Sequence, residues 1–164
     1  MSFETQGIEQ LRLELLKLAE VPNVATEELK NCAVEVRDLA RKMAPVDEGN
    51  LEKAIKIRNQ GAERNSKGQF FKGGQRKYVI YIDNSMPVPE RDGKVVGDYA
   101  WLMHEHLTPF GPFKLGDKSR EKQASDPKVM VGGKFLERAG EELRDHINSR
   151  LARVVFKYIE AIDN

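Results

Sequence analysis

Apolar side chains recur at steps of three and four residues in two stretches near the start of the chain, the pattern of amphipathic helices. The first stretch covers residues 7–20, and its apolar surface is wider than one packing partner needs. The N-terminal segment 1–22 is therefore open to two interpretations, a helix of the core or a helix that docks on a neighbouring subunit. The second stretch is expected to run from an N-cap at Thr26 to Met43, before Pro45 ends it. Its apolar face consists of Leu29, Cys32, Ala33, Val36, Leu39, Ala40 and Met43.

The longest helical pattern closes the chain, from about Lys134 to Ile162. At a rise of 1.5 Å per residue this helix would be about 40 Å long, and the diameter of a small domain is about 30 Å. We expect either a spine helix that lies across the sheet of its own domain or a tail whose end packs on an adjacent subunit.

Two segments in the middle of the chain have the pattern of strands. Apolar and charged residues alternate over residues 54–58, and an apolar run covers residues 78–82. Because both faces of the second run are apolar, that strand should be covered on two sides, or on one side by another chain. The Gly-rich segment between the two strands predicts a long hairpin with a mobile tip at residues 59–75.

A short helix, DYAWLMHEHL, is expected to begin at Asp98, with Tyr99 and Trp101 anchoring it against the sheet. The stretch 108–132 is rich in Pro and Gly and is expected to be a variable loop. A structureless connection of this length in a compact domain usually serves binding or is ordered by a partner.

These elements predict a single α+β domain over residues 1–164, with N-terminal helices, a small antiparallel sheet carrying a long hairpin, and a long C-terminal helix packed across it. The content of 40% hydrophobic and 32% charged residues suits one core with much polar surface, and the net charge of +1 gives no general attraction for nucleic acid or anionic membrane. Cys32 is the single cysteine, so no intrachain disulfide can form. With neither a signal-peptide pattern nor a long apolar run, we expect a protein made in a reducing cytoplasm that has no membrane partner.

Candidate catalytic chemistry is sparse. The strongest cluster is His104-Glu105-His106, but histidines two positions apart do not share a helix face, where metal ligands need a spacing of three or four. The sequence has no phosphate-binding glycine loop, no GxSxG elbow and no Cys–His arrangement suited to nucleophilic attack. We therefore expect no enzyme activity, no cofactor, no metal site and no catalytic residue.

The segment 58–77 is basic and Gly-rich, with two adjacent aromatic residues at its centre. Such a loop can bind a phosphate backbone and stack bases, or it can be an assembly arm whose aromatics enter a neighbour's pocket. It can also be merely solvated, and the sequence leaves all three readings open. The candidate interface or DNA-facing residues are Arg58, Arg64, Lys67, Phe70, Phe71, Lys72, Arg76 and Lys77.

Three stretches, read in order, resemble a known family. RKMAPVDEGNLEKAI is similar to the "APVDTGNLRxSI" signature of phage tail-component proteins, also described as tail-completion, head–tail joining or minor tail proteins. DYAWLMHEHL resembles that family's "YAxxxHE" segment, and GGKFLERAGEEL resembles its closing "AKFLERAL" segment. This sequence departs from the family at Glu48, where Thr is usual, and at Gly140, where a helix former is usual. The resemblance implies roles in the fold or in partner contacts for Pro45, Asp47, Gly49, Leu51, Tyr99, His104, Glu105, Phe135 and Leu136.

The resemblance implies a structural virion protein of the neck or tail. Its expected partners are further copies in a ring, for which six is one option, other neck and tail proteins, and genomic DNA in the channel. Three functions from different classes follow. The first is a structural one, either a ring subunit that stabilises the head–tail joint or another minor tail or capsid-associated component. The second is a DNA-binding module using residues 58–77, and the third is a hydrolase using the His104 region. Salt-dependent DNA binding by the monomer would favour the second, and bound metal the third.

Overall fold

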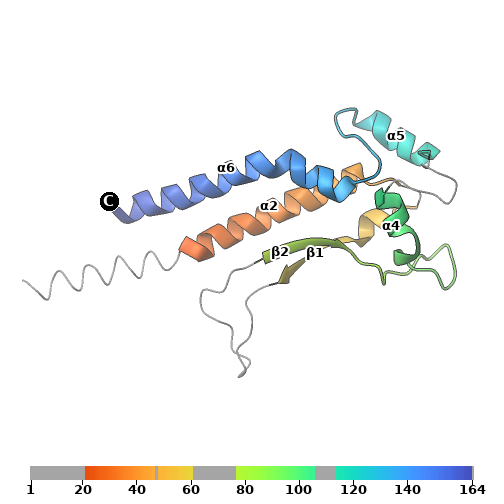
Figure 1. Cartoon of the computed structure of the whole chain (residues 1–164), viewed down its shortest axis with the longest axis horizontal. Coiled ribbons are helices and arrows are strands. Elements are labelled where there is room, and N and C mark those ends of the chain that lie inside the picture. Colours follow the sequence, from red (N-terminus) through yellow and green to blue (C-terminus); the bar gives the residue numbers. More distant parts are fainter. Residues whose placement is uncertain (1–20, 47, 61–76, 106–113, 164) are drawn as a thin grey trace, which may run out of the picture. The chain divides into compact units, whose positions relative to one another are not determined.

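The computed structural model describes residues 21–46, 48–60, 77–105 and 114–163. In chain order these form α2, α3, β1, β2, α4, α5 and α6 (Figure 1). The chain divides into two compact units, and each is described by itself. The first unit comprises Met1–Cys32, Gln60–Lys77 and Asp145–Asn164, and the second comprises Ala33–Asn59 and Tyr78–Arg144.

Helix α2 (Val21–Met43) contains the second predicted helix and extends it backwards. Residues 21–25 are helical, so the helix continues through Pro22, and the expected N-cap at Thr26 is wrong because Thr26 lies inside the helix. The remainder of the predicted N-terminal helix, residues 1–20, lies outside the described residues.

The two strands are β1 (Ile55–Gln60) and β2 (Lys77–Ile82), which pair in a two-stranded antiparallel sheet (Figure 1). The predicted hairpin is confirmed at its base, while residues 61–76 lie outside the described residues. Every residue from Tyr78 to Ile82 is only half-buried, so this chain leaves the apolar run of β2 partly exposed.

Two short helices follow, α4 (Gly97–Glu105) and α5 (Asp117–Ser125). Helix α4 was predicted, although it begins one residue earlier, and the side chain of Asp98 accepts a hydrogen bond from the Val95 N–H at 3.1 Å. Helix α5 lies within 108–132, so the expectation of a structureless connection is wrong for residues 117–125.

Helix α6 (Phe135–Asp163) confirms the long C-terminal helix. Among the described residues, the buried apolar side chains all fall between Cys32 and Ala139 in the sequence, and Phe135 and Ile55 are completely buried. In the last part of α6, residues 145–161, no side chain is buried. The α+β fold class is therefore confirmed, and the core belongs mainly to the second unit.

Within the first unit, Arg150 of α6 donates to the Glu28 carboxylate of α2 at 2.7 Å through Nε. Both side chains are largely shielded from solvent, so a partly buried ion pair links those parts of the two helices. No helix in the described ranges combines the length and apolar character needed to cross a bilayer.

Candidate functional site

The turn after α2 is built to reverse the chain sharply. Pro45 is buried, and Gly49 has φ of 78°, the left-handed region that a residue with a Cβ adopts only at a cost. The turn leads into α3 (Asn50–Ala54), where Leu51 is 4% exposed. Leu51 is therefore aimed into the core, as the first motif indicates, while Asp47 lies outside the described residues.

Helix α5 holds this turn through polar side chains. Ser119 is 2% exposed, and its hydroxyl both accepts from the Val46 N–H and donates to the Val46 carbonyl, each at 2.9 Å. Lys122 donates to the carbonyls of Arg41 at 2.7 Å and Ala44 at 2.8 Å and pairs with the Glu52 carboxylate. A lysine ammonium is favourable there because the last carbonyls of α2 lack intrahelical partners and carry the negative end of the helix dipole.

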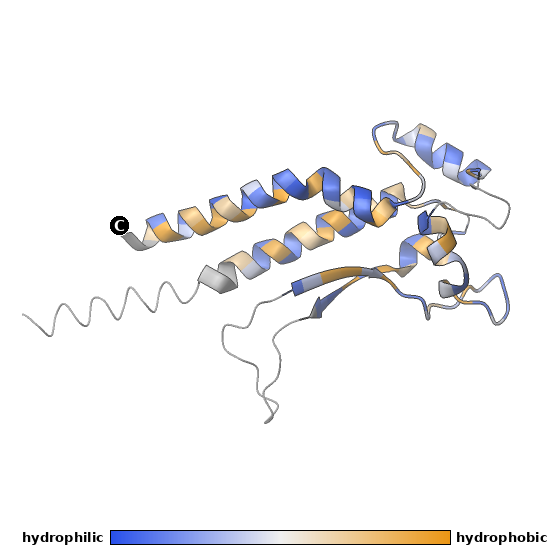
Figure 2. Cartoon of the chain, viewed as in Figure 1, coloured by the Kyte–Doolittle hydropathy of each residue, from blue (hydrophilic) through white to orange (hydrophobic). Residues whose placement is uncertain are grey.

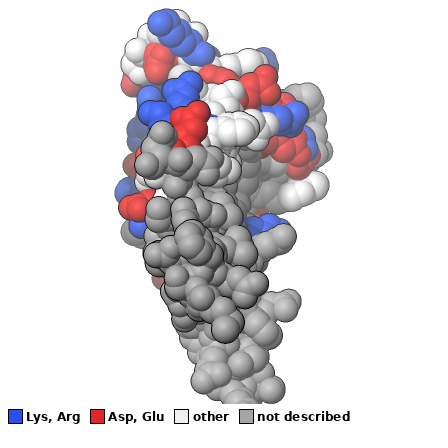
Figure 3. Space-filling model, turned by 90° about the vertical axis from the view of Figure 1, so that its left-hand side faces the viewer, with Lys and Arg blue, Asp and Glu red and all other residues white. Residues whose placement is uncertain are grey.

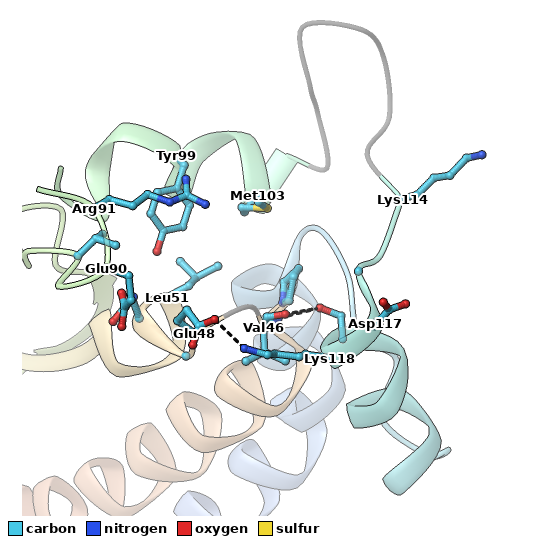
Figure 4. A pocket seen from close by; sticks show the side chains of 16 residues that line it. Val46, Glu48, Leu51, Glu90, Arg91, Tyr99, Met103, Lys114, Asp117 and Lys118 are labelled. Carbon is cyan, nitrogen blue, oxygen red and sulfur yellow. Dashed lines mark hydrogen bonds and ion pairs between the residues drawn. The ribbon is translucent and has the colours of Figure 1, made fainter.

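A pocket of about 460 Å³ opens between the turn, α4 and the start of α5 (Figure 4). Leu51, Tyr99 and Met103 form apolar walls, and Lys118 pairs with Glu48 at the rim at 2.7 Å. In Figure 4, Met103 points into this space and Lys114 points away from it. The pocket is thus lined by residues of the first and second sequence motifs and by residues at the start of α5. The sequence analysis did not predict the contribution of α5.

The second and third motifs meet at the start of α6. The rings of His104 and Phe135 make an edge-to-face contact with their centroids 4.9 Å apart, and the Lys134 N–H donates to the His104 carbonyl. Lys134 Nζ also donates to Glu105 Oε1 at 2.9 Å. Hydrogen bonds from Lys134 and then from His104 hold the pKa of the Glu105 carboxyl below its usual range. Leu136, expected to seat α6 beside Phe135, is only half-buried.

Trp101 does not anchor α4. Its side chain is 64% exposed, while Tyr99, two residues earlier, lines the pocket. Residues two apart point to different sides of a helix, so only one of the two can face the interior. The expectation that both aromatics pack inward is therefore wrong, and α4 presents an indole to solvent.

The base of the hairpin carries a local charge network. Lys56 Nζ lies 2.6 Å from Asp83 Oδ2, and hydrogen bonds from Lys56 and Ser85 lower the pKa of Asp83 to about 2. The Arg58 guanidinium lies over the Tyr81 ring, 5.1 Å from its centroid. Arg58 and Lys77 are the described members of the basic segment, while Arg64, Lys67, Phe70, Phe71, Lys72 and Arg76 lie outside the described residues.

Figure 3 shows one face of the molecule, and the described side chains visible on it include positive and negative charges side by side. This part of the surface therefore carries no field of a single sign. In the described ranges no three His, Cys, Asp or Glu side chains form a group that could hold a metal ion. His106 of the His104-Glu105-His106 cluster lies outside those ranges. The described residues therefore bring the three motifs together through packing and polar contacts.

Residues 9–88, just under half of the chain, match the family model described as "Bacteriophage HK97-gp10, putative tail-component". The first motif lies inside this match, and the second and third lie beyond it. Searches of curated proteins and of solved structures find no significant match. The resemblance seen in the sequence is nevertheless confirmed over residues 9–88, which are similar to the HK97-gp10-like tail components of bacteriophages.

Proposed function

We propose that this chain is a non-catalytic structural subunit of a tailed bacteriophage virion, located in the neck or upper tail. In this proposal, copies assemble as a ring at the head–tail junction and stabilise the joint. The observation that carries it is the exposure of large apolar side chains in a chain similar to phage tail components: Trp101 is 64% exposed and Met130 is 69% exposed.

Strand β2 supports the same proposal. Its apolar residues from Tyr78 to Ile82 are only half-buried, and the sheet has just two strands among the described residues. A two-stranded hairpin is marginally stable alone and offers unpaired edges, so a neighbouring subunit could both cover the apolar face and extend the sheet. Heterologous contacts of this kind, repeated by rotation, close into a ring.

The first test is the mass of the purified chain by light scattering, alone and together with the products of its neighbouring genes. The proposal predicts a ring or a defined complex. A chain that stays monomeric at high concentration and with every neighbour would contradict it. A monomer that instead binds DNA with a steep salt dependence would favour the DNA-binding function of residues 58–77.

The second test asks whether Trp101 lies in the interface between subunits. Trp101→Glu should lower incorporation of the chain into particles without lowering its melting temperature, because an exposed indole contributes little to the isolated fold but a buried charge is costly in an interface. The exposed Lys94→Ala serves as the control and should be incorporated normally. If the Trp101→Glu variant is incorporated normally, α4 is not part of the interface between subunits.

A further inference from the structure

Helix α5 belongs to the second unit but has almost no apolar surface of its own. Its sequence, DKSREKQAS, has Ala124 as its one apolar residue, and Ala124 is exposed. In Figure 2 the helix is coloured as hydrophilic along most of its length. Helices in proteins normally gain most of their stability from a buried apolar face, so α5 depends on other forces.

Those forces are the hydrogen bonds and ion pairs that Ser119, Lys122 and Lys118 make with the turn and the end of α2. The apolar anchors lie after the helix, where Val129 and Val131 are buried and the Gly132 N–H donates to the Met43 carbonyl at 2.9 Å. Gln123 of α5 also bonds to these anchors, since its side chain donates to the Val129 carbonyl at 2.7 Å and accepts from the Val131 N–H at 2.6 Å. Release of α5 would therefore break polar contacts only, including these two, while the side chains of Val129 and Val131 stay buried.

Segments with few buried apolar contacts open at free energies well below that of global unfolding. We propose that α5 is a polar clasp over the turn after α2 (residues 44–46 and 48–50), which opens as one unit while the core stays folded. Opening removes the wall that Gly116 to Ser119 give the pocket and frees the main-chain atoms of Val46. If the proposed function holds, the open state presents the first family motif to a neighbouring subunit, whereas the opening itself is a property of the isolated chain.

Residue-resolved amide hydrogen exchange on the whole chain tests this proposal. The Val46 N–H is bonded to the Ser119 hydroxyl, so it reports release of α5. The Arg120 N–H is bonded to the Gly116 carbonyl within α5 and reports unwinding of the helix, which follows release because a nine-residue helix is marginal without tertiary contacts. The Val96 N–H, bonded to the Met86 carbonyl in a residue that is 0% exposed, reports the core. We expect the first two amides to share one opening equilibrium and to be protected about 100-fold less than Val96.

A lysine substitution sharpens the test. Lys122→Met keeps the apolar stem but removes the ammonium, and should speed exchange of the Val46 and Arg120 amides about tenfold or more without changing Val96. Lys128→Met, at an exposed lysine beyond the helix, should change none of the three. Equal protection of all three amides in the unaltered chain, or a Lys122→Met variant that leaves Val46 and Arg120 unchanged, would overturn the clasp. Neither result depends on ring formation, so failure of the clasp and failure of the proposed function can be distinguished.

Discussion

Glu105, the last residue of α4, receives a hydrogen bond from Nζ of Lys134, the residue immediately before α6, at 2.9 Å. Lys134 has φ of 55°, a left-handed conformation that costs a non-glycine residue about 1–2 kcal/mol. Its bonds to Glu105 and to the His104 carbonyl hold that conformation and fix where α6 starts. The second motif, which contains Glu105, and the third motif, which contains Lys134, are thus linked by this ion pair although a long stretch of chain separates them.

This ion pair predicts a specific acid sensitivity. The pKa of Glu105 lies below 4.5 in the folded chain, so its carboxylate contributes stability above about pH 4.5 that is lost as the pH falls through the lower folded-state pKa. Glu105→Gln should lower the free energy of unfolding at neutral pH and make it less dependent on pH below about 4.5. Urea unfolding across this range measures both effects. Glu121→Gln in α5, at an exposed carboxylate, is the control, and equal pH dependence of both variants would exclude a role for Glu105.

The start of α6 should be far more sensitive to truncation than its end. Phe135 is 0% exposed and Phe156 is 65% exposed. Phe135→Ala should cost about 3–5 kcal/mol of unfolding free energy, since it removes a buried ring and leaves a cavity. Phe156→Ala in the isolated chain should stay within about 0.5 kcal/mol. Chemical denaturation of the two variants compares them directly, and similar losses would show that the end of α6 is packed in the isolated chain.

Two glycines should respond to alanine in opposite directions. A Cβ at Gly97 would lie 2.8 Å from the Asn84 carbonyl oxygen, so Gly97→Ala must displace the backbone and should lower the melting temperature. A Cβ at Gly140 meets nothing within 4 Å, and alanine there should stabilise α6 by about 0.5–1 kcal/mol. Thermal unfolding measures both variants. A destabilised Gly140→Ala would mean that this position is more crowded than the structure shows.

Gly49 should be replaceable only by residues that tolerate the left-handed region. Gly49→Ala should cost about 1 kcal/mol because its φ is 78°. Gly49→Asn should cost less, since asparagine adopts this conformation more readily than other residues with a side chain. The order of the two midpoints in urea is the measurement, and an alanine variant at least as stable as the asparagine variant would contradict the argument.

The sequence predicted the elements whose side chains follow a period. The apolar stripe from Leu29 to Met43 located most of α2, and the longer C-terminal stripe located α6. Alternation located β1, and an apolar run located β2. Helix α5 was missed because a segment with a single apolar residue has no hydrophobic period, although Gly116 followed by Asp117 was available as a helix-start signal. Trp101 was misplaced because the short α4 pattern does not decide which of two aromatics faces inward. The contacts of Ser119 and Lys122 join distant parts of the chain, so no local pattern could indicate them.

The most direct test of the central claim is electron microscopy and infectivity of particles made by a phage genome that lacks this gene, with and without complementation by the unaltered chain. The proposed role predicts tails and DNA-filled heads that fail to join stably, and rescue by complementation. Normal, infectious tailed particles in the absence of the chain would contradict it.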